Sequence, residues 1–122
     1  MYELTIDWMG RPHTSNDERR LHYRQLSRIH RSWREAGAQA AMLAKLPKGL
    51  GPSIVTFQAM YGNRVMTDAG AIAPTGKCVI DGLVDWGCWP DDNSTWVTEE
   101  RYKAPVLGHV NALLVTITPA EA

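Results

Sequence analysis

The chain has 122 residues, of which 44% are hydrophobic and 21% are charged, a composition typical of one globular domain. Its 13 Lys and Arg residues balance its 13 Asp and Glu residues, which excludes the basic total charge common in nucleic-acid-binding proteins. No apolar run approaches the ~20 residues that cross a bilayer, so we expect no membrane partner. Residues 1–7 lack the features of a signal peptide, and the two cysteines form no CxxC motif, so we expect a cytoplasmic protein with reduced thiols.

The charges are separated along the chain although they cancel in total. Residues 11–34 contain seven arginines against two acidic residues, a local balance of +5. Residues 68–100 contain seven acidic residues against one lysine, a local balance of −6. The positive segment could bind a polyanion, and the negative segment could bind a metal cation. The alternative is that both are solvated faces of opposite charge that pair with each other.

The first half of the chain predicts a strand and a long helix. Residues 2–8 alternate between apolar and polar side chains, as in a half-buried strand. After a loop over residues 10–16, residues 17–46 predict a helix that ends at the Pro and Gly residues of positions 47–52. The apolar side of this helix comprises Leu26, Ile29, Trp33, Ala36, Ala40 and Leu43. The opposite side carries Arg20, Arg24, Arg28, Arg31 and Arg34.

The second half predicts one more helix and three strands. Pro74 suits the first turn of a helix and Gly87 suits its end. The predicted elements are a strand over residues 53–61, a helix over 74–86, and strands over 96–103 and 110–118. Leu113, Val115 and Ile117 share one face of the last strand. The sequence therefore predicts a single α+β domain over residues 1–122, in the order β-α-β-α-β-β, with one mixed sheet and two main helices packed on it.

Several acidic residues of the second half are candidates for metal chemistry. Asp68 follows a predicted strand, and the pair Asp91 and Asp92 lies in a predicted turn. Lys77 and Asp81 lie four residues apart, on one face of the intervening helix. Carboxylates of this kind bind Mg²⁺ together with phosphate, and a lysine can stabilise phosphate charge. The alternatives are an ordinary turn at the Asp pair and an ordinary surface pair on the helix.

The segment from Lys77 to Asp92 resembles the motif of the RusA-like Holliday junction resolvases. That motif has a Lys, then Asp-x-Leu, then a Gly, and finally an Asp-Asp pair. The stretch from Asp68 to Lys77 is similar to the acidic loop that leads into the helix of this family. The N-terminal strand and the Arg-rich helix containing Trp33 agree, so the resemblance covers nearly the whole chain.

The resemblance implies a Mg²⁺-dependent endodeoxyribonuclease, with Mn²⁺ expected to substitute, that cuts four-way DNA junctions by paired nicks as a homodimer. It implies a role in DNA recombination and repair, in the cytoplasm of a bacterial or phage-infected cell. By position, the metal ligands are Asp68, Asp92 and Asp91, with Asp81 as a substitute ligand. Lys77 is then the catalytic lysine.

Two positions of the acidic loop depart from the family pattern. The second Asp of the family is Gly70 here, and the Asn that follows it is Ala71. The alternative function is therefore a dimer that binds branched DNA and has weak or lost nuclease activity. Both functions predict phosphate contacts by a common set of arginines. This set is Arg20, Arg24, Arg28, Arg31, Arg34 and Arg64.

Five further residues have simpler interpretations. Asn16 is expected to cap the long helix. His22 and His30 are two helical turns apart and are interpreted as helix-surface or DNA-facing residues. Trp86 and Trp89 are expected in the core or in a dimer interface rather than stacked on an unpaired DNA base.

Overall fold

A computed structural model describes residues 1–64 and 67–120 of the protein. Its elements are β1 (Tyr2–Ile6), α1 (Ser15–Arg20), α2 (Tyr23–Leu43), β2 (Ser53–Tyr61), η1 (Ala69–Ile72), α3 (Ala73–Trp86), β3 (Val97–Leu107) and β4 (Ala112–Pro119). The α+β class, the mixed sheet and the two main helices are confirmed, together with their order. Residues 65–66, inside the predicted loop over 62–73, lie outside the described residues.

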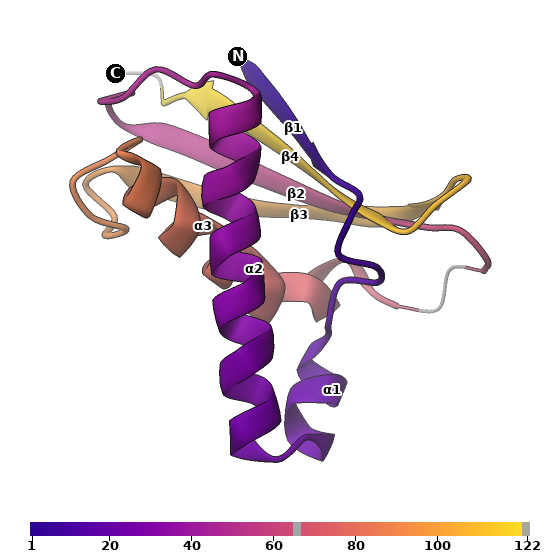
Figure 1. Ribbon diagram of the computed structural model, residues 1–122. Coiled ribbons are helices and arrows are strands. Elements are labelled where there is room, and N and C mark those ends of the chain that lie inside the picture. The colour runs from indigo at the N-terminus through magenta and orange to yellow at the C-terminus, as the bar shows by residue number, and fades with distance from the viewer. Residues whose placement is uncertain (65–66, 121–122) are drawn as a thin grey trace.

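The four strands form one sheet in the order β1-β4-β2-β3. β4 is antiparallel to both β1 and β2, whereas β3 runs parallel to β2. A parallel neighbour requires a crossover, and α3 supplies it between β2 and β3. Both α2 and α3 lie on the same face of the sheet, and α2 extends well beyond it with α1 beside its N-terminal part (Figure 1).

The core lies between this sheet face and the two helices. Alternate residues of β2 are buried, as period-two strands require, and Phe57 is at the centre. The predicted face of the last strand is confirmed, because Leu113, Val115 and Ile117 are all buried. Trp33 of α2 is buried against the same core.

The prediction of a single helix over residues 17–46 is wrong, because the helix is interrupted at Leu21. Leu21 has extended backbone angles, and α1 and α2 are separate helices on either side of it. Each helix has its own reciprocal cap, formed by Thr14 with Asp17 in α1 and by His22 with Gln25 in α2. The expected cap at Asn16 is therefore also wrong, since Asn16 lies inside α1.

The apolar side of α2 is confirmed in its middle and wrong at its end. Trp33, Ala36 and Ala40 are buried, but Leu43 is 66% exposed. Leu43 is the last residue of α2, and the chain leaves the helix there for a turn that buries Leu46 instead.

The predicted helix over 74–86 is confirmed to within one residue. Pro74 lies in the first turn of α3, and Gly87 ends the helix with a φ of 110°, which glycine adopts without strain. The strand predicted over 96–103 extends further, to Leu107. Pro105 is accommodated because β3 is an edge strand and its register with β2 shifts at this point.

The expected packing role of the tryptophans is confirmed for the core. Trp89 is 2% exposed and donates its indole N–H to the Gly51 carbonyl. Trp86 is partly buried and donates to the Leu46 carbonyl. Among the described residues, no helix combines the length and apolar character needed to span a bilayer.

Candidate functional site

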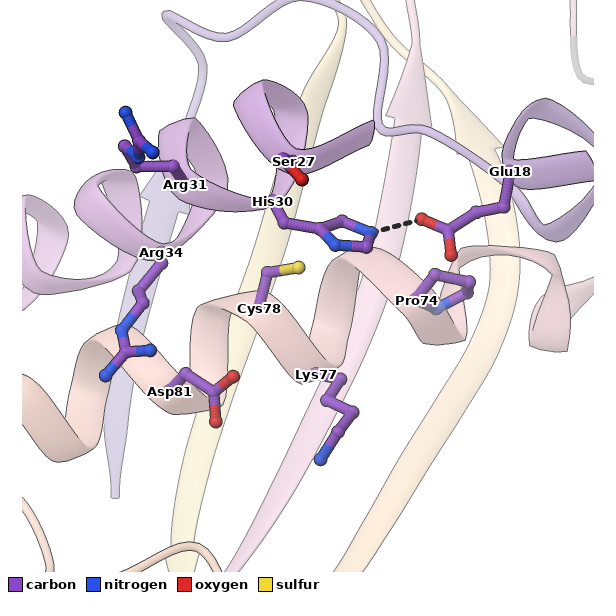
Figure 2. Close-up of a pocket in the computed structure, with 9 residues that line it drawn as sticks. All are labelled: Glu18, Ser27, His30, Arg31, Arg34, Pro74, Lys77, Cys78 and Asp81. Atoms are coloured by element: carbon purple, nitrogen blue, oxygen red, sulfur yellow. Dashed lines mark hydrogen bonds and ion pairs between the residues drawn. The ribbon is translucent and has the colours of Figure 1, made fainter. Parts of the chain in front are cut away.

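A cleft of about 460 Å³ opens where α1, α2 and α3 meet (Figure 2). It contains basic, acidic and sulfur-bearing side chains from all three helices. Its lining is Glu18, Ser27, His30, Arg31, Arg34, Pro74, Lys77, Cys78 and Asp81. Lys77 and Asp81 come from one face of α3, as their spacing predicted, and Arg31 and Arg34 come from successive turns of α2.

Lys77 meets the Asp pair at one side of this cleft. The Lys77 ammonium lies 3.5 Å from Asp92 Oδ2, although the two residues are 15 positions apart. The contact forms because the chain reverses at Gly87 and returns past the end of α3. Lys77 is 72% exposed and Asp92 is 33% exposed, so both remain accessible to a substrate.

Asp81 and Asp92 also interact with each other. Burial raises the pKa of Asp81, Lys77 opposes the shift, and a hydrogen bond to Asp92 raises it further. The pKa of Asp92 is lowered, mainly by a hydrogen bond from Asp91 and with help from Lys77. Two carboxyl groups with oppositely shifted pKa values and one ammonium therefore share a single location.

Asp91 closes the turn that carries Asp92. Its carboxylate accepts a hydrogen bond from the Asp92 backbone N–H at 2.7 Å and one from the Asn93 amide at 3.5 Å. Asp91 therefore has the role of an ordinary turn residue, which was the alternative interpretation of the Asp pair. Asp92 is the member whose side chain reaches Lys77.

Asp68 does not line the cleft that Lys77 and Asp81 line. It precedes η1 and lines a separate hollow of about 420 Å³, together with Asn16, Gly70 and Ala71. Within residues 1–64 and 67–120, the predicted carboxylates do not supply three ligand atoms within 4.8 Å of one another. The structure thus brings together Lys77, Asp81 and Asp92, with Asp91 adjacent, while the assignment of Asp68 as a metal ligand stays a prediction.

The predicted arginine row is exposed along its whole length. Arg20, Arg24, Arg28, Arg31 and Arg34 all reach the surface. The Arg34 guanidinium forms a bidentate ion pair with the Asp85 carboxylate, at 2.6 and 2.8 Å. Arg24 contacts the Tyr23 hydroxyl and ring. Arg64 lines a third hollow, with Arg11 and Arg20.

A second group of side chains in the cleft was not predicted as a site. Ligand atoms of His13, His30 and Cys78 lie within 4.8 Å of one another. The Glu18 carboxylate lies 3.0 Å from His13 Nε2 and 2.5 Å from His30 Nε2. His30 therefore faces this cluster, whereas the sequence interpretation placed it on the helix surface or against DNA.

The ionisation of this second group follows from its burial. Burial lowers the pKa of His13, and Glu18 opposes the shift. Burial raises the pKa of the Cys78 thiol to about 11, so the thiol is neutral at pH 7. Both cysteines are unpaired and buried, in agreement with the expected reduced thiols.

Comparison with protein-family models and with curated proteins finds no match to this chain. The site is therefore interpreted from its own geometry and from the resemblance noted in the sequence.

Proposed function

We propose that the protein is a Mg²⁺-dependent endodeoxyribonuclease that resolves Holliday junctions or other branched DNA by paired nicks, acting as a homodimer. The observation that supports this proposal is the contact between Lys77 and Asp92, with Asp81 beside them, at an arginine-bordered cleft. Phosphodiester hydrolysis with a metal ion requires a positively charged side chain that binds the phosphate and carboxylate oxygens that bind the metal, and this site has both.

The donor set at this location fits Mg²⁺. Mg²⁺ prefers oxygen ligands and is commonly held by one or two carboxylates together with phosphate and water. Asp81 and Asp92 would hold it, with Asp91 next to them, and Mn²⁺ suits the same oxygens. When bound, the ion supplies Lewis-acid polarisation of the phosphate and activation of water. Asp68, which lines a neighbouring hollow of about 420 Å³, stays a predicted further ligand.

Lys77 is the residue that we assign to the phosphate itself. In the free protein its ammonium is held by Asp92, which keeps a mobile side chain near the reaction centre. A phosphate oxygen placed between Lys77 and the carboxylates would meet positive charge where negative charge develops. Arg31 and Arg34 border the same cleft and would hold flanking phosphates.

A synthetic four-way junction with labelled ends tests the proposal. We expect symmetric nicks from the wild type in Mg²⁺ and a loss of nicking of about 100-fold or more in Asp92→Asn. Asp7→Asn is the matched control, because Asp7 is an exposed carboxylate next to β1 that does not line the cleft. Tight junction binding without cleavage at any Mg²⁺ or Mn²⁺ concentration would reject the nuclease.

The second candidate function is a branched-DNA-binding dimer without efficient cleavage. Gly70 at the position of the family's second Asp favours it, since it leaves a site with one carboxylate fewer than the family pattern. It predicts junction binding that survives Asp92→Asn. Sedimentation is a further test of both functions, because a monomer at micromolar concentration would contradict the dimer that paired nicks need.

A further inference from the structure

We propose that His13, His30 and Cys78, together with Glu18, form a binding site for a divalent transition-metal ion, with zinc as the best match. The proposal is independent of the nuclease, because none of these four residues belongs to the Lys77 and Asp92 site. Two imidazoles, one thiol and one carboxylate are ligands that zinc takes in proteins. Mg²⁺ prefers oxygen-only sets, which makes this site chemically distinct from the carboxylate site.

The distances are close to those of a tetrahedral centre. Zinc lies about 2.0–2.3 Å from nitrogen and sulfur ligands, so two ligands of one ion are about 3.3–3.8 Å apart. The ligand atoms of His13, His30 and Cys78 are within 4.8 Å of one another, and Glu18 Oε2 lies against both imidazoles. Side-chain rotation that draws the His13, His30 and Cys78 atoms together by roughly 1 Å, and moves the Glu18 oxygen outward from 2.5 and 3.0 Å to about 3.3 Å, would complete the centre. In Figure 2, the Cys78 sulfur and the Glu18 carboxylate both lie beside the His30 ring.

The hydrogen bonds of His13 point to a cation at this place. His13 is 6% exposed, and its buried Nε2 makes no well-aligned hydrogen bond within the described part of the chain, although a Glu18 oxygen lies 3.0 Å away. The Thr75 hydroxyl donates its one proton to the His13 carbonyl at 2.7 Å, so Nδ1 must donate to the Thr75 oxygen, 2.8 Å away. The Nε2 lone pair of the neutral ring then faces a Glu18 oxygen. A proton on Nε2 or a metal ion would satisfy both atoms, and the Cys78 sulfur, within 4.8 Å of the imidazole ligand atoms, is a ligand that only the metal ion would use.

Thr75 orients the His13 ring, as residues next to the metal ligands commonly do at metal centres. A histidine ligand is usually oriented by a hydrogen bond at its other ring nitrogen, which fixes the tautomer. Thr75 is fully buried and performs this function for His13. The four ligand side chains come from the segment after β1, from α1, from α2 and from α3, so one ion would join three helices to the N-terminal strand segment.

Helix α1 is the element that gains most from such an ion. It has six residues and buries none of them, so apolar packing does not hold it in place. A helix this short is not stable by itself in water. Glu18 is its contact with His13 and His30, and a bound ion would convert that contact into a coordination bond.

The test is metal binding to the full-length protein, stripped with chelator, kept reduced and reloaded with Zn²⁺ or with Co²⁺ as a visible probe. We expect one ion per chain, a thiolate-to-cobalt charge-transfer band, and a higher Tm with Zn²⁺. Cys78→Ser should remove the band and weaken Zn²⁺ binding by more than about 100-fold, and Thr75→Val should weaken it by about 10- to 100-fold.

The chain supplies matched controls for both ligand types. Cys88→Ser removes the other buried cysteine, and His109→Ala removes a histidine outside the cluster; both should keep the stoichiometry and the cobalt spectrum. His30→Gln changes a half-exposed side chain, so a folded variant that has lost the ion is expected even if Cys78→Ser is unstable. The proposal is overturned if the wild type binds no Zn²⁺, or if Cys78→Ser and His30→Gln bind Zn²⁺ and Co²⁺ as the wild type does.

Discussion

A β-carbon on Gly82 would lie 2.0 Å from the carbonyl oxygen of Arg34, closer than any real side chain approaches a backbone atom. Gly37 makes the reciprocal approach, because a β-carbon there would lie 2.6 Å from the Val79 carbonyl oxygen. The two glycines therefore set the separation of α2 and α3. Since the cleft is bordered by these helices, the same pair sets the distance between the arginines of α2 and the Lys77 side of α3.

Gly82→Ala is expected to destabilise the protein severely. The added methyl group meets backbone that cannot move without separating two helices, so we expect a loss of about 3 kcal/mol or more in the free energy of unfolding. Gly70→Ala is the control, because a β-carbon at Gly70 meets nothing within 4 Å and φ is not positive there. Urea denaturation of both variants measures the difference. Equal stability of the two would contradict the close crossing.

The pair of Arg34 and Asp85 predicts a pH-dependent contribution to stability. The Arg34 guanidinium lowers the pKa of Asp85 below its usual 3.8. The contribution is therefore present above pH 3.8 and lost as the pH falls through the lower, folded-state pKa. Both side chains are about half exposed, so Asp85→Asn should cost under about 1 kcal/mol at pH 7. The Tm difference from wild type should shrink at pH 3; a constant difference would exclude the ion pair as its source.

Arg31 and Arg34 are expected to contribute unequally to DNA binding. Arg31 has no ion pair within residues 1–64 and 67–120, whereas Arg34 must first leave Asp85. Arg31→Ala should weaken junction binding and reduce the slope of log K against log salt by about 1. Arg34→Ala should change the slope less. Fluorescence anisotropy across a salt series measures both, and unchanged slopes would place the DNA elsewhere.

Lys77→Met is expected to reduce junction cleavage by about 100-fold, with little change in binding, because the lysine acts on charge that develops in the transition state. Lys103→Met provides a control, since Lys103 is an exposed lysine of β3 that lines a hollow away from the cleft. Single-turnover cleavage and binding without Mg²⁺ separate the two effects. A parallel loss of binding would instead assign Lys77 to DNA affinity.

Much of the fold was predictable because its signals are local. The alternation in β1 and β4, Pro74 and Gly87 each act within a few residues of themselves, and these elements are confirmed. The break at Leu21 was not predictable in the same way. Helical periodicity continues across it, and His22 is an unusual cap whose imidazole accepts the Arg24 N–H only in the folded chain.

The candidate site likewise contains residues that local spacing predicted and residues that only the folded chain brings together. Lys77 and Asp81 were found on one helix face because their spacing fixes it. Asp68 was grouped with them through the family resemblance, and its role as a ligand stays a prediction. The histidine and cysteine cluster was missed because His13, His30 and Cys78 are 17 and 48 residues apart, and only the packing of α2 on α3 brings them together.

The polar helix α1 has a consequence for how the cleft opens. Because none of its six residues is buried, we expect α1 to open locally at a free energy below that of global unfolding. Its amides should therefore exchange with deuterium well before those of β2. Each such opening would remove Glu18 from His13 and His30, so the cleft would then be bordered by α2 and α3 alone.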